Sequence, residues 1–246
     1  MDTLDSVEMN NGEAMKLSYQ ENNVNTADLY LIAERVARVS PLTPSVVSIT
    51  DMFTPERMRV ESFIKDIYKR SYNADITVNY PVLMSVRNNE DEILAAVGFR
   101  YAESETLFLE HYTPNPIEEH LGCKRGNIVE IGNLASAGQG ASVFLFAALA
   151  SYLDYKNIEF AAITGTDYLH RYFKRIGLNP SKICDADIDA VANEGQCWGS
   201  YYDTQPRVLA GSVPHGIKRL HSALGTHYHS NAPELYPRLH HKDINE

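Results

Sequence analysis

Cysteines are scarce in this 246-residue sequence, and long apolar runs are absent. The three cysteines, Cys123, Cys184 and Cys197, include no CxxC pair, so we expect reduced thiols and a cytoplasmic location. The longest apolar run, residues 143–150, is far shorter than the ~20 residues that a membrane-spanning helix needs. The first thirty residues contain no basic stretch followed by an apolar run, which indicates no secretory signal.

Positive charge is also scarce. The sequence has 22 lysines and arginines against 32 aspartates and glutamates, a net charge of −10. This balance argues against a protein whose main task is to bind nucleic acid phosphates. No basic amphipathic helix is strong enough to enter a bilayer, so we expect no stable membrane insertion. His227 and His229 have a spacing that zinc can use, but no cysteine or carboxylate pattern completes a tetrahedral site, and we expect no metal.

The two ends of the sequence differ from its middle. The N-terminal residues are polar and acidic, and a helical stripe of four apolar residues follows within residues 27–38. The C-terminal residues contain most of the histidines. We therefore predict an N-terminal extension with one short helix (residues 1–44), one α/β domain (residues 45–213) and a His-rich, solvated C-terminal extension (residues 214–246).

The middle of the sequence alternates between the apolar periods of strands and helices. Pro55 stands at the first position of a predicted helix, where its missing N–H costs nothing. Helices are predicted at residues 55–72, 142–155 and 167–176, and strands at residues 46–50, 82–86, 93–100, 106–110, 128–135, 159–164, 199–203 and 207–211.

A strand, a glycine-containing loop and an apolar helix follow one another at residues 128–155. Gly138 and Gly140 let the backbone approach a ligand closely, and the first helical turn points its free N–H groups at the same place. This pattern is typical of a phosphate or pyrophosphate site, and it is also found in tight turns without a ligand. The candidate cofactor-binding residues are Leu134, Ala135, Ser136, Gly138, Gln139, Gly140, Ala141 and Ser142.

The order of these elements resembles the GNAT acyltransferase fold. Members of that family bind the pyrophosphate of acyl-coenzyme A with an Arg/Gln-Gly-X-Gly-X-Gly/Ala loop; here Gly138 and Gly140 fit, and Ala137 replaces the Arg or Gln. The resemblance implies a mixed, mostly antiparallel sheet with flanking helices and a splayed central strand pair. It also implies a tyrosine that protonates the leaving thiolate, for which Tyr172 is the nearest residue to the usual position.

A narrower resemblance spans about residues 58–215 and points to the bacterial thermostable hemolysin family. It is carried by fragments that come in order and at comparable spacing: NADI at 73–76, PVLM at 81–84, GFR at 98–100, LFLE at 107–110, VEIGNLA at 129–135 and WGSYY at 198–202. That family is similar to the acyl-homoserine-lactone synthases, which share the GNAT-type core and take acyl chains from acyl carrier protein. The resemblance therefore implies an acyl thioester of coenzyme A or of a carrier phosphopantetheine as co-substrate, with no tightly bound cofactor.

Three charged residues are candidates for an acyl transfer to an amine. Glu130, on the strand before the loop, is the candidate base, directly or through water; otherwise it is a structural carboxylate. Glu110 either holds the ammonium of the acceptor or ends a strand facing solvent. Arg100 either binds a carboxylate or phosphate of a substrate or forms an ion pair with Glu103 or Glu105.

Polar groups beside these residues complete the expected site. If the strands separate as in the GNAT family, backbone N–H groups at residues 134–136 stabilise the oxyanion, and Asn133 either donates a further hydrogen bond or faces solvent. Tyr172 is the proton donor or a core aromatic. No cysteine or serine has the setting of a nucleophile, so we expect direct attack in a ternary complex.

The sequence thus predicts an acyltransferase that forms an amide with a small amine or amino acid. Two alternatives stay open, a non-catalytic binding module on the same fold and a membrane-active lytic protein. An acyl carrier protein is an implied partner, with two basic helix faces as docking candidates in an acidic chain. The sequence leaves both a monomer and a homo-oligomer open.

Overall fold

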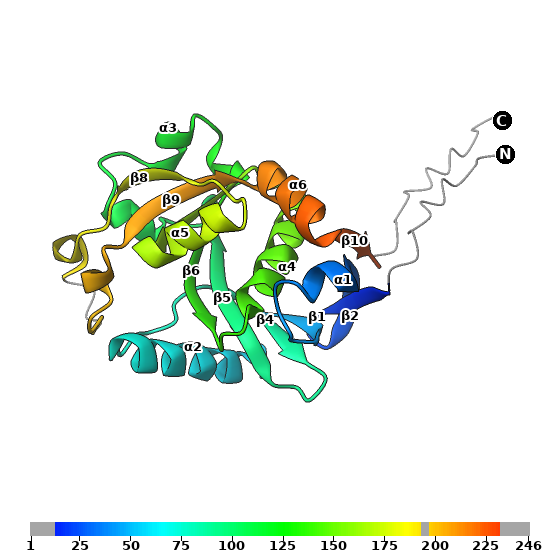
Figure 1. Ribbon diagram of the computed structural model, residues 1–246. Coiled ribbons are helices and arrows are strands. Elements are labelled where there is room, and N and C mark those ends of the chain that lie inside the picture. Colours follow the sequence, from blue (N-terminus) through cyan, green and yellow to red (C-terminus); the bar gives the residue numbers. More distant parts are fainter. Residues whose placement is uncertain (1–12, 193–196, 232–246) are drawn as a thin grey trace, which may run out of the picture.

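The computed structural model describes residues 13–192 and 197–231, and these form one ten-stranded sheet (Figure 1). Two neighbouring pairs, β1 with β3 and β6 with β7, are parallel, and the other pairs are antiparallel. The order across the sheet is β10 (His227–Ser230), β2 (Val24–Ile32), β1 (Ala14–Glu21), β3 (Pro44–Thr50), β4 (Val82–Asn88), β5 (Ile93–Tyr101), β6 (Ile128–Ser136), β7 (Phe160–Gly165), β9 (Arg207–Ser212) and β8 (Ser181–Asp185).

Helices pack on both faces of this sheet. The α-helices are α1 (Ala33–Val36), α2 (Arg57–Tyr72), α3 (Ile117–Leu121), α4 (Ala141–Tyr155), α5 (Asp167–Arg175) and α6 (Val213–Leu224). The 3-10 helices are η1 (Phe108–His111), η2 (Arg125–Asn127), η3 (Ile188–Val191) and η4 (Tyr202–Thr204).

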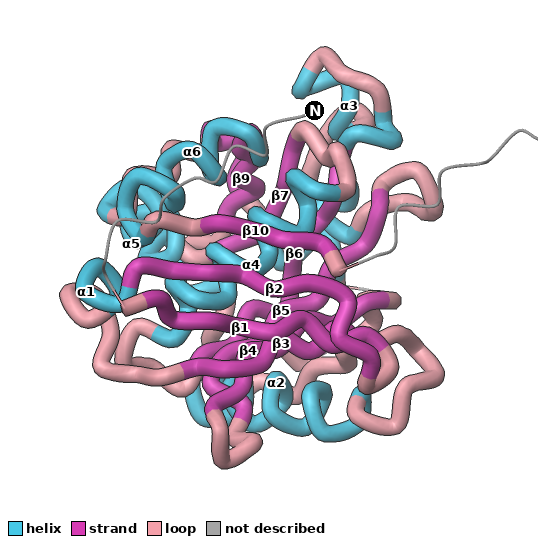
Figure 2. The backbone as a smooth tube through the Cα atoms, turned by 90° about the vertical axis from the view of Figure 1, so that its right-hand side faces the viewer, coloured by secondary structure: helices cyan, strands magenta, loops and turns pink. Residues whose placement is uncertain are grey.

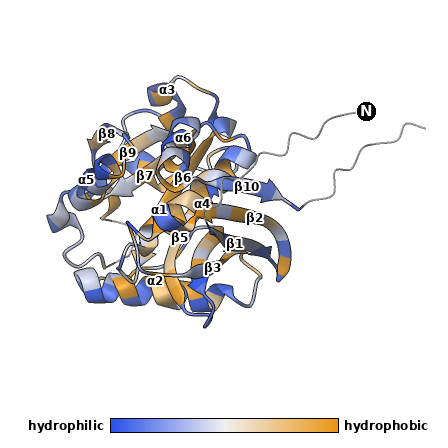
Figure 3. Ribbon diagram, turned by 45° about the vertical axis from the view of Figure 1, so that its right-hand side comes forward, coloured by the Kyte–Doolittle hydropathy of each residue, from blue (hydrophilic) through white to orange (hydrophobic). Residues whose placement is uncertain are grey.

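The strands supply an apolar core on each face because successive side chains point to opposite sides of a sheet. On β4, Leu83 packs in one cluster with Ile64 of α2, whereas its neighbour Met84 packs in another with Phe144 of α4. The predicted helix at residues 142–155 is apolar around most of its circumference, and it lies buried between the sheet and α6 (Figure 3).

The central strands β6 and β7 separate along their length. They pair in parallel from Ile128 with Phe160 to Ile131 with Ile163, and no pair follows, although β6 continues to Ser136. On its other side β6 carries a bulge against β5, because two residues, Asn133 and Leu134, stand where β5 has one. The predicted fold class, a GNAT-like, mostly antiparallel sheet with a splayed central pair, is confirmed.

The helix predicted within residues 27–38 is wrong over most of its length. Residues 27–32 belong to β2, which forms a hairpin with β1 around a turn at Asn22 and Asn23, and within residues 27–38 only α1 is helical. Both turn asparagines have positive φ, 51° and 64°, which a tight hairpin turn requires and which asparagine tolerates. Figure 2 shows these strands side by side with β3 and β10.

The C-terminal segment also differs from the expectation of a solvated tail. Its first part is α6, which Ser212 caps by accepting from the His215 N–H, and its second is β10, which pairs with β2. Both predicted extensions thus contribute to the same sheet, while the domain boundaries at residues 44 and 213 stay a prediction. Residues 1–12 and 232–246, including His240 and His241, lie outside the described residues.

Two short elements were also wrongly predicted. The expected strand at residues 106–110 is instead the 3-10 helix η1. The N–H of Leu107, the residue before η1, donates to the side chain of Glu110. The expected closing hairpin does not form from residues 199–211, because β9 pairs with β7 and β8 while residues 202–204 are η4.

Candidate active site

Two adjoining cavities lie where β6 and β7 separate. The larger, of about 840 Å³, is lined by the loop after β6 and by α2 and α5, and the smaller, of about 330 Å³, by η1, β5 and residues around Trp198. They share five lining residues: Tyr68, Gly132, Asn133, Thr164 and Tyr201. A molecule that extends through the gap therefore has one end in each cavity.

The glycine loop forms one wall of the larger cavity. Gly138, Gln139 and Gly140 have successive positive φ values of 97°, 52° and 82°, and Gly140 is the N-cap of α4 without a capping side chain. In the described part of the chain, the backbone N–H groups of Gln139, Gly140 and Ser142 form no hydrogen bond. Unbonded N–H groups at a helix N-terminus favour an anion, as the sequence predicted for this loop.

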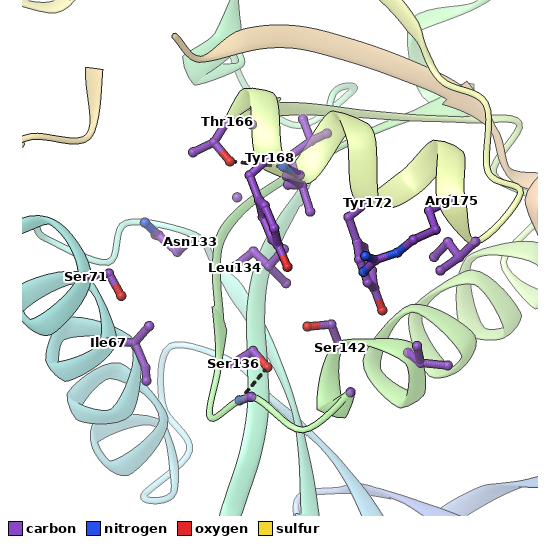
Figure 4. Close-up of a pocket in the computed structure, with 18 of the residues that line it drawn as sticks. Ile67, Ser71, Asn133, Leu134, Ser136, Ser142, Thr166, Tyr168, Tyr172 and Arg175 are labelled. Atoms are coloured by element: carbon purple, nitrogen blue, oxygen red, sulfur yellow. Dashed lines mark hydrogen bonds between the residues drawn. The ribbon is translucent and has the colours of Figure 1, made fainter. Parts of the chain in front are cut away.

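The loop is held by bonds that leave these donors available. Ser136 accepts from the Gly138 N–H at 3.2 Å, the contact drawn in Figure 4, and the Ser40 hydroxyl donates to the Gln139 carbonyl at 2.7 Å. Leu134, Ser136 and Ser142 line the same cavity, whereas Ala135 and Ala141 are buried in the two cores.

The β6 bulge places polar backbone at the junction of the two cavities. Asn133 has a φ of +49°, a conformation that asparagine adopts more readily than most residues, and it lines both cavities. It is half-buried and lies near the Tyr68 hydroxyl, so it is not the solvent-facing strand residue of the alternative expectation. Because β7 no longer pairs beyond Ile131, residues 132–134 face the gap.

Tyrosines from α5 line the opposite wall (Figure 4). Tyr172 and Tyr168, one helical turn apart, both extend from α5 toward the loop and the start of α4. Tyr172 is half-buried against Phe146, with the Arg175 guanidinium 5.0 Å from its ring centre, and burial raises its pKa. Arg175 is the one charged side chain among the described residues that line this cavity.

Glu130 lies beneath the smaller cavity and does not line it. It is completely buried, and its carboxylate accepts the N–H groups of Phe108 at 2.9 Å and Leu109 at 2.8 Å. Its Oε2 is 3.4 Å from Nε of Arg100, and the Tyr80 hydroxyl lies near the same carboxylate. Burial raises the pKa of Glu130, although Arg100 and these donors oppose the shift.

Arg100 lines the smaller cavity and connects several of its groups. Its guanidinium forms an ion pair with Glu105 at 3.2 Å, as one expectation had it, and contacts Glu130. Its Cζ lies 4.5 Å from the ring centre of Tyr80. The Arg100 guanidinium thus borders the open space of this cavity.

The structure does not bring Glu110 to either cavity. Both carboxylate oxygens bind Arg125, at 2.6 and 2.8 Å, and they also accept the N–H groups of Leu107 and Ile117. Burial alone would raise the pKa of Glu110, but Arg125 and the two N–H donors outweigh it and lower the pKa to about 2. Glu110 therefore ties η1 to α3.

Replacing Glu110 by glutamine is expected to lower the melting temperature at pH 7. The group's pKa is lowered on folding, so its stabilising contribution is present above the ordinary value of 4.5 and is lost as the pH falls toward about 2. Thermal melts from pH 7 to pH 2 should show the difference between variant and wild type shrinking over that window. Glu119→Gln, an exposed residue of α3, is the control. An unchanged melting temperature at pH 7 would contradict the structural role.

Sequence reasoning missed Tyr80, which lines the smaller cavity. Phe108, Trp198, Tyr201 and Tyr202 line this cavity together with Tyr80. Tyr80 precedes β4 in a segment whose apolar residues alternate with polar ones, and the buried residues of that alternation include Tyr80. The usable signal was the pair of strand glycines, Gly98 and Gly132, which oppose each other beneath its ring.

Within residues 13–192 and 197–231, no group of three or more histidine, cysteine, aspartate or glutamate residues is arranged to hold a metal ion. No helix among them is long and apolar enough to span a membrane.

The family model described as thermostable hemolysin matches residues 51–217. No curated protein matches the chain. The matched residues include β6 with Glu130, the glycine loop, both α5 tyrosines, and Tyr80 and Arg100 of the smaller cavity.

Solved structures similar to this chain share its fold at low sequence identity. TofI in an apo form is 13% identical with a TM-score of 0.52, covering 71% of this chain and 95% of TofI. FeeM, an N-acyl amino acid synthase from uncultured soil microbes, is 14% identical with a TM-score of 0.51, covering 73% of this chain and 96% of FeeM. BjaI, a CoA-dependent acyl-homoserine lactone synthase solved with SAM and isopentyl-CoA, is 9% identical with a TM-score of 0.51, covering 73% and 89%.

Proposed function

The chain belongs to the thermostable hemolysin family, and from the geometry of its cleft we propose that it is an acyltransferase that forms amides. The acyl group comes from a thioester of coenzyme A or of an acyl carrier protein, and the acceptor is a small amine or amino acid. The observation that carries the proposal is the bulged end of β6, which is unpaired on its β7 side and lies between the glycine loop and a second cavity.

The larger cavity suits the thioester donor. The N–H groups of the glycine loop and the α4 N-terminus would bind the pyrophosphate or phosphopantetheine phosphate, and Arg175 would add a positive charge. The pantetheine arm would then lie in the gap beside residues 132–134. A third, apolar cavity of about 450 Å³ shares Ile163 and Leu220 with the larger one and offers space for an acyl tail.

The smaller cavity suits the acceptor. Its wall of aromatic rings would pack against the acceptor, and the Arg100 fork would bind a carboxylate where the acceptor has one. Because the cavities meet at Asn133, the acceptor nitrogen would approach the thioester carbon from the side opposite to the pantetheine arm.

The reaction proceeds by direct attack. The amine nitrogen bonds to the thioester carbon, and the Leu134 N–H with the Asn133 side chain stabilises the oxyanion. The C–S bond then breaks, and the leaving thiolate takes the Tyr172 hydroxyl proton, which solvent restores. The proton lost by the amine goes to Glu130, whose burial raises its pKa toward the working range.

The proposal is tested by incubating the purified full chain with acyl-CoA and acyl-carrier thioesters of several lengths and with a panel of amines and amino acids. We expect an amide by mass spectrometry, with one equivalent of free thiol released. Thioester binding without any amide would contradict the enzyme and favour a non-catalytic binding module. Dye release from liposomes by the protein alone would favour a lytic protein.

Replacing Tyr172 by phenylalanine is expected to lower kcat about 100-fold, the usual scale for losing a general acid. The loss should be smaller with a thioester of a more acidic thiol, because that leaving group needs no proton. Tyr155→Phe, on the outer part of α4, is the matched control. An equal loss in Tyr168→Phe with full activity in Tyr172→Phe would move the role to Tyr168.

A further inference from the structure

The candidate base cannot touch an acceptor in this structure. Glu130 is completely buried, and it lines neither cavity. Its two oxygens already accept two backbone N–H groups at 2.8 and 2.9 Å, and Arg100 lies against one of them. A proton from the acceptor therefore reaches Glu130 only through another group.

Tyr80 connects Glu130 with the smaller cavity. Its hydroxyl lies over Gly132, two residues after Glu130 on the same face of β6, and its side chain lines the cavity. The ring lies across Gly98 and Gly132, which are paired on β5 and β6. A Cβ added at Gly98 would come within 2.6 Å of the Tyr80 side chain, and one added at Gly132 would collide with the hydroxyl itself. Two opposed glycines thus fix the hydroxyl at the cavity floor.

The charges around Tyr80 suit a group that passes a proton on. Burial and the Glu130 charge raise the pKa of Tyr80 well above its ordinary value, so the hydroxyl is neutral at rest. Arg100, over the ring face at 4.5 Å, opposes that shift and would stabilise negative charge that develops on the phenol oxygen. Tyr68 faces Tyr80 from α2, and His111 of η1 and Tyr202 of η4 line the same cavity.

We propose that Tyr80 is the catalytic residue that touches the acceptor amine and relays its proton to Glu130. This inference rests on the proposed function. As the C–N bond forms, the amine N–H proton moves to the Tyr80 oxygen and the Tyr80 hydroxyl proton moves to the Glu130 carboxylate. The phenol is unchanged after the step, Glu130 is neutral, and solvent later takes its proton.

The test compares wild type, Tyr80→Phe and Gly132→Ala in the amide-forming assay. We expect Tyr80→Phe to lower kcat about 100-fold with little change in the acceptor KM, and to abolish the rise of kcat with pH that reports ionisation of Glu130. Gly132→Ala should have the same effect, because its methyl group displaces the hydroxyl. Tyr101→Phe, the next residue on β5 after Arg100, is the control and should keep wild-type activity.

The possible results separate failure of the Tyr80 relay from failure of the proposed function. Wild-type kcat and an unchanged pH profile in Tyr80→Phe would overturn the relay while leaving the acyltransferase intact. Absence of amide with wild-type protein would instead reject the proposed function. A melting temperature and a coenzyme A affinity close to wild type are the check that Tyr80→Phe is folded.

Discussion

Glu130→Gln is expected to lower kcat at least about 100-fold, the scale of general-base loss, while the protein still folds and binds coenzyme A. Glutamine keeps an oxygen that accepts one of the Phe108 and Leu109 N–H groups, but it cannot take a proton. Burial raises the pKa of Glu130, and the ionised form is the active one, so wild-type kcat should rise with pH through a value above the ordinary glutamate range. That rise should be absent in the variant.

The double variant that combines Glu130→Gln with Tyr80→Phe tests whether the two residues act in one relay. If Glu130 acts through Tyr80, the double variant should lose little more than either single variant, because both remove one relay. Multiplied losses would show that the two residues act separately. Glu130→Gln leaves the buried Arg100 charge with less compensation, so a melting curve must accompany the kinetics. Near-normal turnover in a folded Glu130→Gln protein would eliminate the base.

Gly138→Asp is expected to weaken coenzyme A binding at least about 100-fold. The loop N–H groups and the helix dipole favour negative charge, so a carboxylate beside them would repel the donor phosphates and compete for the same donors. An added Cβ at Gly138 meets no atom within 4 Å, so crowding is not the cause, although its φ of +97° strains any side chain. Calorimetric titration with coenzyme A measures the effect.

Two variants separate charge from backbone strain. Gly138→Asn carries the same strain without the charge, and it should keep most of the affinity. Gly122→Asp, at the end of α3, also has positive φ and open space around its Cβ, and it lies outside both cavities. Equal losses in Gly138→Asp and Gly138→Asn would contradict an electrostatic role for the loop.

The sequence predicted the strand, loop and helix around Gly138 and Gly140 because their signals are local. Helix α2 and the β4–β5 hairpin were predicted for the same reason, since each carries its own apolar period and turn residues. The family resemblance added the separated strands, which no local period indicates.

The N-terminal hairpin was missed because β2 fits two periods. Its Leu29 and Ile32 fall on a helical stripe, while Ala27, Leu29 and Leu31 alternate as in a strand, and these three are its buried apolar residues. Pairing with β1 and β10 makes this segment a strand. β1 directly precedes it in the chain, whereas β10 lies near the other end of the described residues. The turn at Asn22 and Asn23 was the available local signal.

The candidate site residues depended on burial that a sequence does not report. Glu110 and Glu130 are both acidic residues in apolar segments, yet Arg125 holds one in a structural ion pair and Tyr80 connects the other to a cavity. Their partners come from η2 and from the segment before β4, and no local pattern shows that these segments pack against the two glutamates. The sequence thus predicted the strand, loop and helix that line the larger cavity, and it missed the contacts that Glu110 and Glu130 make.

The measurement that tests the central claim most directly is a crystal structure of the chain with a non-hydrolysable acyl-CoA analogue. The account predicts its pyrophosphate at the loop of residues 138–142 and its carbonyl oxygen within about 3.2 Å of a backbone N–H of residues 133–135. It also predicts the acyl carbon at the junction with the cavity that Tyr80 lines. An analogue bound elsewhere, with side chains closing the gap between β6 and β7, would contradict it.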